Sequence, residues 1–190
     1  MREWLNWPQF PKQSAKRKAG DLYGMVVAAA RQPAFYGPGR VADTPEGRFE
    51  LIALHLFLLA ERLTSDKPEG EDLARHLIEA FVTDMDDCMR EMGVGDLTVP
   101  KRVKRAAAVF YERSGDYRNA LATDPRAASS GGDPLSCVIA AALQDAPQQT
   151  AFSAGMADYM RANHAAFKRA SYAGVAAGKT SFMPASLAAA

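Results

Sequence analysis

The chain of 190 residues lacks most of the features that mark a secreted, redox or metal-binding protein. It has only two cysteines, Cys88 and Cys137, and their separation matches no metal or redox motif. Because both lie in apolar helical patterns, we expect buried free thiols in a reducing compartment. The amino terminus has no secretory apolar segment, which predicts that the protein stays in the cytoplasm.

Long apolar runs and catalytic motifs are also missing. The longest apolar run, residues 51–60, has about half of the roughly 20 residues that a membrane-spanning helix needs, and His55 interrupts it. The histidines show no zinc-ligand spacing, and there is no phosphate-binding loop and no nucleophile elbow. An Asp-x-Asp-Asp pattern begins at Asp84, but on a helix Asp84 and Asp86 point about 200° apart. We therefore expect no enzyme, no catalytic residue, no metal site and no cofactor.

An excess of charge of one sign is absent as well, since the formal net charge is +1. Attraction to nucleic acid or membrane must then come from local patches. One such patch, here called the basic cluster, stands at the expected start of a helix and consists of Lys101, Arg102, Lys104 and Arg105. Cations are disfavoured there, because the first turn exposes free N–H groups and the positive end of the helix dipole. We expect the cluster to contact an acidic partner, with an ordinary solvated surface as the alternative.

Aromatic and basic residues also occur together near the amino terminus. Aromatic rings beside cations suit the headgroup layer of a membrane. The predicted membrane contacts are Trp4, Trp7, Phe10, Lys16, Arg17 and Lys18. Pro8 and Pro11 prevent a regular amphipathic helix here, so an irregular segment without a partner is the alternative.

Apolar periodicity predicts helices and no strand. The fold class is therefore all-α, a single helical domain of about six helices with irregular N- and C-terminal tails. We expect helices over residues 14–32, 45–64, 69–92, 99–121, 134–144 and 150–170. The predicted organisation is an irregular segment 1–13, a helical core 14–122, a linker with additional helices packing on the core over 123–170, and an extended or disordered tail 171–190.

The sequence also indicates where helices begin and end and which residues form the core. Asp43 is expected to cap the second helix in a capping box with Glu46, and Asp133 to cap the fifth. Gly93 suits the end of the third helix. The predicted core contains Leu54, Phe57, Leu58, Leu77, Phe81, Met85 and Phe110.

Charged side chains line two consecutive helices. The predicted stripe on helix 45–64, with a spacing of seven residues, is Arg48, His55 and Arg62. The predicted acidic edge of helix 69–92 is Asp84, Asp87 and Glu91. In an antiparallel hairpin the two sets can face each other, either as an internal salt-bridge network or as a polar groove open to a partner.

Short motifs follow one another in a fixed order from about residue 19 to 121. They are Leu22-Tyr-Gly24, Arg31-Gln-Pro-Ala-Phe-Tyr36, Asp43-Thr-Pro-Glu-Gly-Arg-Phe49, His55, Asp84-Met-Asp86, Arg90-Glu-Met-Gly-Val-Gly-Asp96, Lys101-Arg-Val-Lys104 and Phe110-Tyr111. In order and spacing this set resembles the ubiquinol–cytochrome c chaperone family, the assembly factors of respiratory complex III. Gly178-Lys-Thr-Ser-Phe-Met-Pro184 resembles the family's carboxyl-terminal element, with Met183 interrupting it. The linker and the late helices match poorly.

The resemblance implies an all-helical, non-enzymatic chaperone that binds newly made cytochrome b or another complex III subunit. Mitochondrial members of the family work beside the ribosome, so a ribosome contact is implied too. Without a long transit peptide the chain looks bacterial, cytoplasmic and peripherally associated with the inner membrane. Partner contacts are expected at the charged stripe, the acidic edge and the basic cluster. The basic cluster can meet ribosomal RNA, phospholipid or an acidic client loop, and no oligomeric state is predicted.

Two other classes of protein remain as alternatives. A helical nucleic-acid-binding module, for ribosomal RNA in particular, would place the basic cluster against phosphates. The near-neutral net charge and the absence of a helix-turn-helix signature argue against it, and DNA is not an expected partner. A small α-helical enzyme would need a closed pocket with a perturbed carboxylate.

Overall fold

The computed structural model describes residues 12–65, 68–123, 132–143 and 150–185. The helices in this part are α1 (Lys12–Ala30), α2 (Pro45–Thr64), α3 (Glu69–Glu91), α4 (Val99–Ala122), α5 (Pro134–Ala142), α6 (Thr150–Arg169) and α7 (Tyr172–Ala176). A short 3-10 helix, Pro33–Phe35, follows α1, and a single bridge between Tyr36 and Val41 is the one strand-like pairing among these residues. The predicted all-α class is confirmed.

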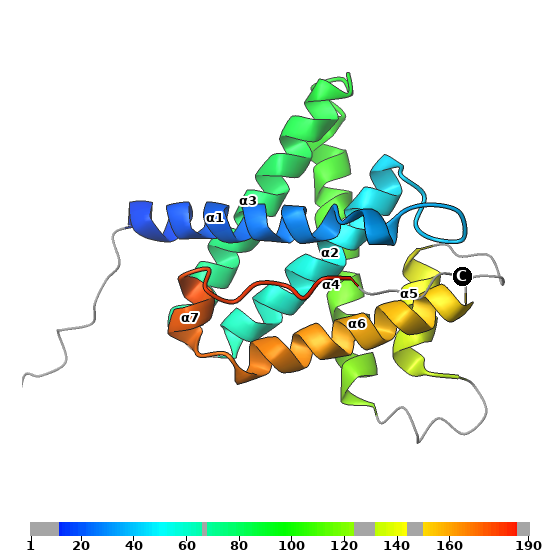
Figure 1. Cartoon of the computed structure of the whole chain (residues 1–190). Helices are drawn as coiled ribbons and strands as arrows, with labels where there is room; N and C mark the ends of the chain where they lie inside the picture. The colour runs from blue at the N-terminus through cyan, green and yellow to red at the C-terminus, as the bar shows by residue number, and fades with distance from the viewer. Residues whose placement is uncertain (1–11, 66–67, 124–131, 144–149, 186–190) are drawn as a thin grey trace, which may run out of the picture.

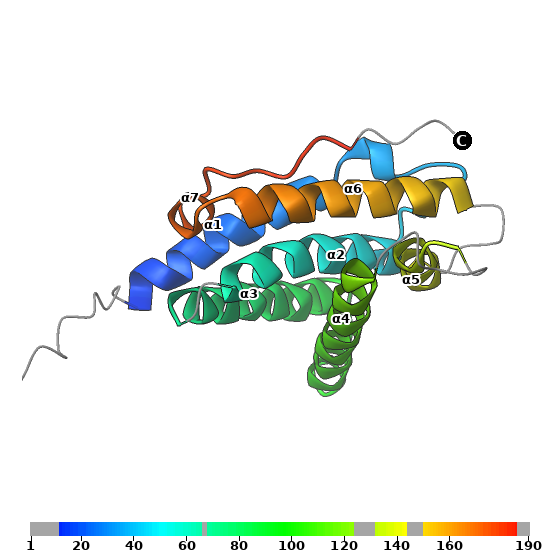
Figure 2. The ribbon, with the colours of Figure 1, turned by 90° about the horizontal axis from the view of Figure 1, so that it is seen from below.

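Helix α2 is the centre of the fold, with α1, α3, α4 and α6 packed around it (Figures 1 and 2). Every residue from 51 to 60 is buried, as a helix covered on all sides requires. Thr44 caps α2, because its hydroxyl oxygen accepts a hydrogen bond from the Gly47 N–H at 3.1 Å. The prediction that Asp43 is the cap is wrong, since its carboxylate binds Arg48 instead.

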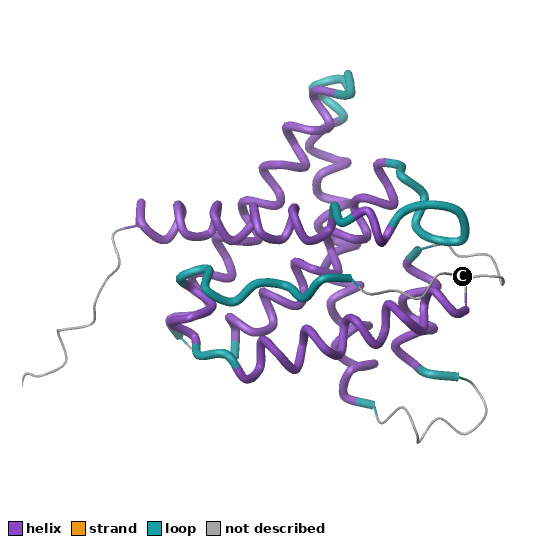
Figure 3. The backbone as a smooth tube through the Cα atoms, in the orientation of Figure 1, coloured by secondary structure: helices purple, strands orange, loops and turns teal. Residues whose placement is uncertain are grey.

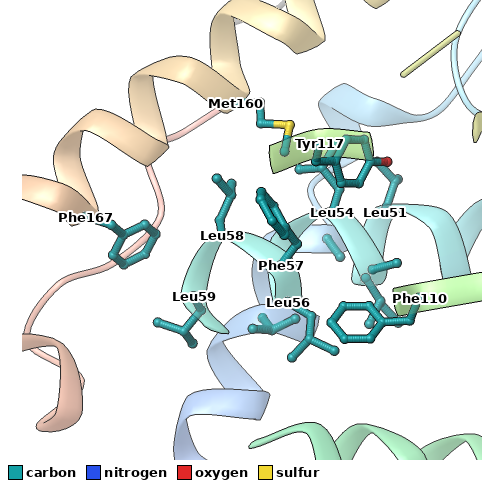
Figure 4. Packing of buried hydrophobic residues seen from close by; sticks show 14 of the residues in the cluster. Leu51, Leu54, Leu56, Phe57, Leu58, Leu59, Phe110, Tyr117, Met160 and Phe167 are labelled. Atoms are coloured by element: carbon teal, nitrogen blue, oxygen red, sulfur yellow. The ribbon is translucent and has the colours of Figure 1, made fainter. Parts of the chain in front are cut away.

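The hydrophobic core is formed mainly by α2 and the helices that surround it. Figure 4 shows apolar side chains of α2 gathered with others from α4 and α6, among them Leu54, Phe57, Leu58, Phe110, Tyr117 and Met160. The predicted core residues are buried, except that Met85 is only partly covered. Phe81 lies among three other aromatic rings, those of Tyr23, Phe49 and Phe110.

Helices α3 and α4 form a hairpin whose joined ends project beyond the other helices (Figure 1). Figure 3 shows the turn that joins them at the far end of this projection. Gly93 ends α3 with a φ of +77°, in the left-handed region that favours glycine, as predicted. We call residues 90–105, which comprise the end of α3, the turn and the first turns of α4, the hairpin tip.

Helix α5 begins as predicted at Asp133. Its carboxylate accepts hydrogen bonds from two N–H groups of the first turn, each at 3.3 Å, and also binds Arg161 of α6. Cys137 on this helix is exposed and Cys88 is half-buried, so the prediction of two buried thiols is wrong. Neither cysteine forms a disulfide.

The described part of the tail differs from the expected extended or disordered segment 171–190. It contains α7, in which Val175 is fully buried. Residues 177–185 then run along α1 and α6 (Figure 2). The backbone N–H groups of Met183 and Ala185 donate to the side chains of Asn163 in α6 and Gln32 after α1, at 2.9 and 2.8 Å. These contacts make the tail part of the packed structure.

Candidate functional site

The structure separates the charged stripe of α2 from the acidic edge of α3. Arg48 is exposed and binds Asp43 at 2.6 Å, which holds the pKa of that carboxyl below its ordinary value. Asp84 is half-buried and accepts a hydrogen bond from the Tyr23 hydroxyl of α1 at 2.7 Å. Burial and this bond raise the pKa of Tyr23, which remains protonated. Arg48 therefore does not form the salt-bridge network with α3 that was one of the two predicted arrangements.

His55 belongs to the core, which corrects its prediction as a partner contact. Its side chain is fully buried, Nδ1 lies 2.7 Å from the Leu51 carbonyl oxygen and Nε2 lies 2.9 Å from the Tyr159 hydroxyl. A carbonyl oxygen can only accept, so Nδ1 carries the hydrogen and Nε2 accepts from Tyr159. Burial lowers the pKa of His55 to about 4, which keeps the ring neutral at pH 7. The rings of Phe35 and Phe182 pack against it.

Arg62 has a structural role that its position on the charged stripe does not predict. Its Nε and Nη2 donate to the Phe167 and Ala170 carbonyl oxygens at 2.9 and 2.7 Å, at the carboxyl end of α6. The Phe167 carbonyl oxygen also accepts from the Ala170 N–H at 3.1 Å, so the guanidinium adds a second donor there, supplies a donor to the Ala170 carbonyl just past the helix, and meets the negative end of the helix dipole. Arg62 thereby fixes α6 to α2.

The basic cluster occupies the first turns of α4, where all four side chains are exposed. No ion pair joins any of them to another residue in the described ranges. Neighbouring Asp96 is bound by Arg90 at 2.5 Å, and Thr98 makes no side-chain cap of α4. Asp87 and Glu91 on α3 are exposed too. On the hairpin tip, therefore, the four cations of the basic cluster have no ion-pair partner among the described residues, whereas Arg90 is paired with Asp86 and Asp96.

The predicted membrane contacts divide into two groups. Trp4, Trp7 and Phe10 lie outside the described residues. Lys16 and Arg17 are exposed in the first turns of α1, and Lys18 beside them is partly covered. Helix α1 is therefore able to present Lys16 and Arg17 to a surface.

A groove lies where α2, α4 and α6 meet, and it encloses about 480 Å³. The apolar part of its lining comes from Phe57, Leu121 and Ala122. The polar part comes from Glu61, Arg62, Ser65, Arg118, His164 and Lys168. No local motif marks this groove, because its three helices are brought together only by tertiary packing.

The polar lining of the groove is partly neutralised internally. The Arg118 guanidinium binds the Glu61 carboxylate at 2.8 Å and lies 5.9 Å above the centre of the Phe57 ring. Burial and the nearby Lys168 ammonium lower the pKa of His164, which favours its neutral form. The exposed Lys168 forms no ion pair with another described residue. The groove therefore combines an apolar floor with a rim of net positive charge.

Two other kinds of site are missing from the described part of the chain. No three metal-ligating side chains of His, Cys, Asp or Glu come together there. None of its helices has the length and apolarity needed to cross a bilayer.

The model of the ubiquinol-cytochrome C chaperone family matches residues 39–182. The chain belongs to this family. The family is one of chaperones for complex III assembly, which confirms the resemblance found in the motifs. The match contains the motifs from Asp43 to Tyr111 and extends through the linker and α6, while the motifs at residues 22–24 and 31–36 lie before it. It includes every residue that lines the groove.

A solved structure supports the same assignment. The crystal structure of the Cbp3 homolog from Brucella abortus superposes with a TM-score of 0.73 at 33% sequence identity. The alignment covers 90% of this chain and 91% of that one. The search of curated proteins returned no match.

Proposed function

We propose that this member of the ubiquinol-cytochrome C chaperone family is a non-enzymatic assembly factor that binds newly made cytochrome b. The proposal is supported above all by the family match over residues 39–182, which contains the whole groove. Another complex III subunit is the alternative client. No catalytic step is part of the proposal, and the one fully buried histidine, His55, is engaged within the core.

The chemistry of the groove fits such a client. A membrane protein offers apolar helices that are flanked by charged loops. The groove offers an apolar floor at Phe57 and Leu121 beside a basic rim at Arg118 and Lys168. A segment in which an apolar helix meets an acidic flank could place its apolar side chains on the floor and its carboxylates at the rim. We propose the groove as the client contact.

The place of action we propose is the cytoplasmic face of the inner membrane of a bacterium. A client that is inserted into the bilayer as it is made requires its chaperone close by. The amino-terminal aromatic residues Trp4, Trp7 and Phe10, together with Lys16 and Arg17, are proposed to contribute to that contact. A ribosome contact is a further proposal from the family resemblance.

Co-purification tests the client and the groove together. The tagged full-length chain is expressed in cells that assemble complex III, membranes are solubilised in mild detergent, and captured cytochrome b is quantified by mass spectrometry. Lys168→Glu reverses the unpaired cation at the rim, and Ala122→Trp fills the groove from its exposed edge. Both should lower cytochrome b capture at least fivefold.

Lys179→Glu is the matched control, because Lys179 is exposed outside the groove and the change in charge is the same. This variant should capture cytochrome b as the wild-type chain does. Capture of another complex III subunit in place of cytochrome b would identify that subunit as the client. Equal capture by both groove variants and the wild type would show that the client binds elsewhere.

A further inference from the structure

Two large apolar side chains are exposed at the hairpin tip. Leu97, in the turn between α3 and α4, has 99% of its surface exposed, and Met92, at the end of α3, has 58% exposed. Neighbouring Val99 is fully buried, so the turn is packed on its inner side while Leu97 points outward. Because the hairpin projects from the body of the molecule, these side chains are placed where they meet another surface first (Figure 1).

The charge around these two side chains is positive. The hairpin tip contains five basic and two acidic side chains, a net charge of +3. Of the two acids, Asp96 is bound by Arg90, while Glu91 stands exposed at the end of α3. At 100° per residue, the basic cluster spreads over about 160° of the helix, on the side away from Val99. Leu97 and Met92 thus share the hairpin tip with the four cations of the basic cluster, which have no ion-pair partner among the described residues, while Arg90 is paired with Asp86 and Asp96.

We propose that the hairpin tip is a docking surface for an anionic phospholipid membrane, with the basic cluster among the headgroups and Leu97 and Met92 between the upper acyl chains. Charge complementarity selects an anionic partner, and the exposed leucine and methionine select one with an apolar layer beneath its charges. A nucleic acid would also complement the cations, but it offers no apolar partner to the fully exposed Leu97 in the turn. The inference does not depend on the identity of the client.

Vesicle co-sedimentation of the full-length chain tests the proposal. The two vesicle types are phosphatidylethanolamine with 30% phosphatidylglycerol, and phosphatidylcholine alone. The chain should bind the anionic vesicles, more weakly as salt rises, and bind phosphatidylcholine poorly. Each cation near an anionic membrane strengthens binding about fivefold, so Lys101→Glu with Lys104→Glu should weaken it at least 25-fold.

The apolar contribution has its own variant. Leu97→Ser should weaken binding about tenfold at high salt, where electrostatic attraction is screened. A purely electrostatic surface would not respond to this change. The control for net charge is Arg169→Glu with Lys179→Glu, which reverses two exposed cations near α7, at the opposite end of α3 from the hairpin tip. This control should bind within about twofold of the wild type.

Unfolding must be measured for each variant, so that lost binding is not confused with lost structure. The two lysine reversals should leave the melting temperature unchanged or slightly raised, because negative side chains suit the start of a helix. Equal vesicle binding by the wild type and both tip variants would overturn the proposal. The proposal would also be overturned if the double lysine variant lost binding to a duplex RNA but bound vesicles as the wild type does. Client capture in detergent is independent of this result, which separates this proposal from the proposed function.

Discussion

The buried His55 makes the stability of this protein dependent on pH in a defined window. In the folded chain its pKa is lowered from 6.5 to about 4, because burial disfavours the charged ring. The unfolded chain takes up a proton below pH 6.5 while the folded chain does not. The contribution of His55 to stability is therefore fully present above pH 6.5 and is lost as the pH drops towards 4. Below pH 4 this residue causes little further change in stability.

The magnitude follows from the two pKa values. With 1.36 kcal/mol for each pKa unit, His55 should lower the free energy of unfolding by about 2 kcal/mol between pH 7 and pH 5, and by about 3 kcal/mol at pH 4. Urea denaturation at each pH, followed by circular dichroism, measures this difference.

The matched variant is His55→Gln, whose side-chain amide takes the place of Nε2 and whose oxygen can still accept from the Tyr159 hydroxyl, but which does not titrate. The half-buried His164, whose pKa is also lowered, titrates in both proteins, so the difference between them isolates His55. The variant should start with lower stability at pH 7 and lose about 2 kcal/mol less than the wild type on going to pH 5. Identical pH dependence in the two proteins would refute the placement of His55 in the core.

Further predictions concern the core, the stripe of α2 and the amino terminus. Phe81→Ala should cost about 3–5 kcal/mol of unfolding free energy, measured by urea denaturation, because the ring is fully buried among aromatic neighbours; a loss below about 1 kcal/mol would place it at the surface. Arg62→Met should cost about 1.5–3 kcal/mol by removing charged hydrogen bonds to α6, whereas Arg48→Met should leave the melting temperature nearly unchanged, and equal effects would refute their different roles. Deletion of residues 1–13 should weaken binding to anionic vesicles in co-sedimentation, and equal binding by both chains would exclude the amino-terminal contact.

Apolar periodicity and helix-end signals were sufficient to predict most of the helices. The limits of α2 and the cap of α5 at Asp133 could be predicted because Pro45 and Asp133 act on the nearest turn of backbone. Asp43 was the wrong cap because its neighbour Thr44 is equally suited to the role, and Arg48 was available to bind the carboxylate. Helix α7 was missed because its five residues are too few for a periodic pattern, and its one fully buried side chain, Val175, depends on tertiary contacts.

The candidate site was less predictable, for a physical reason. Periodicity places His55 and Arg62 on one stripe of α2, but it does not say which neighbour covers that stripe. The partner is α6, about 100 residues later in the sequence, whose Tyr159 and terminal carbonyl groups receive these side chains. The groove depends on the same long-range packing. The exposure of the basic cluster, by contrast, was predictable, because cations at the start of a helix gain nothing from the helix itself.

The most direct measurement of the central claim is the amount of complex III in cells from which the gene has been deleted. Membranes are analysed by reduced-minus-oxidised spectra of cytochrome b and by native electrophoresis, with the other respiratory complexes as internal controls. The account predicts that complex III and cytochrome b fall together while the other complexes are retained, and that the wild-type gene restores both. Normal complex III in the deleted cells, or an equal loss of all respiratory complexes, would contradict it.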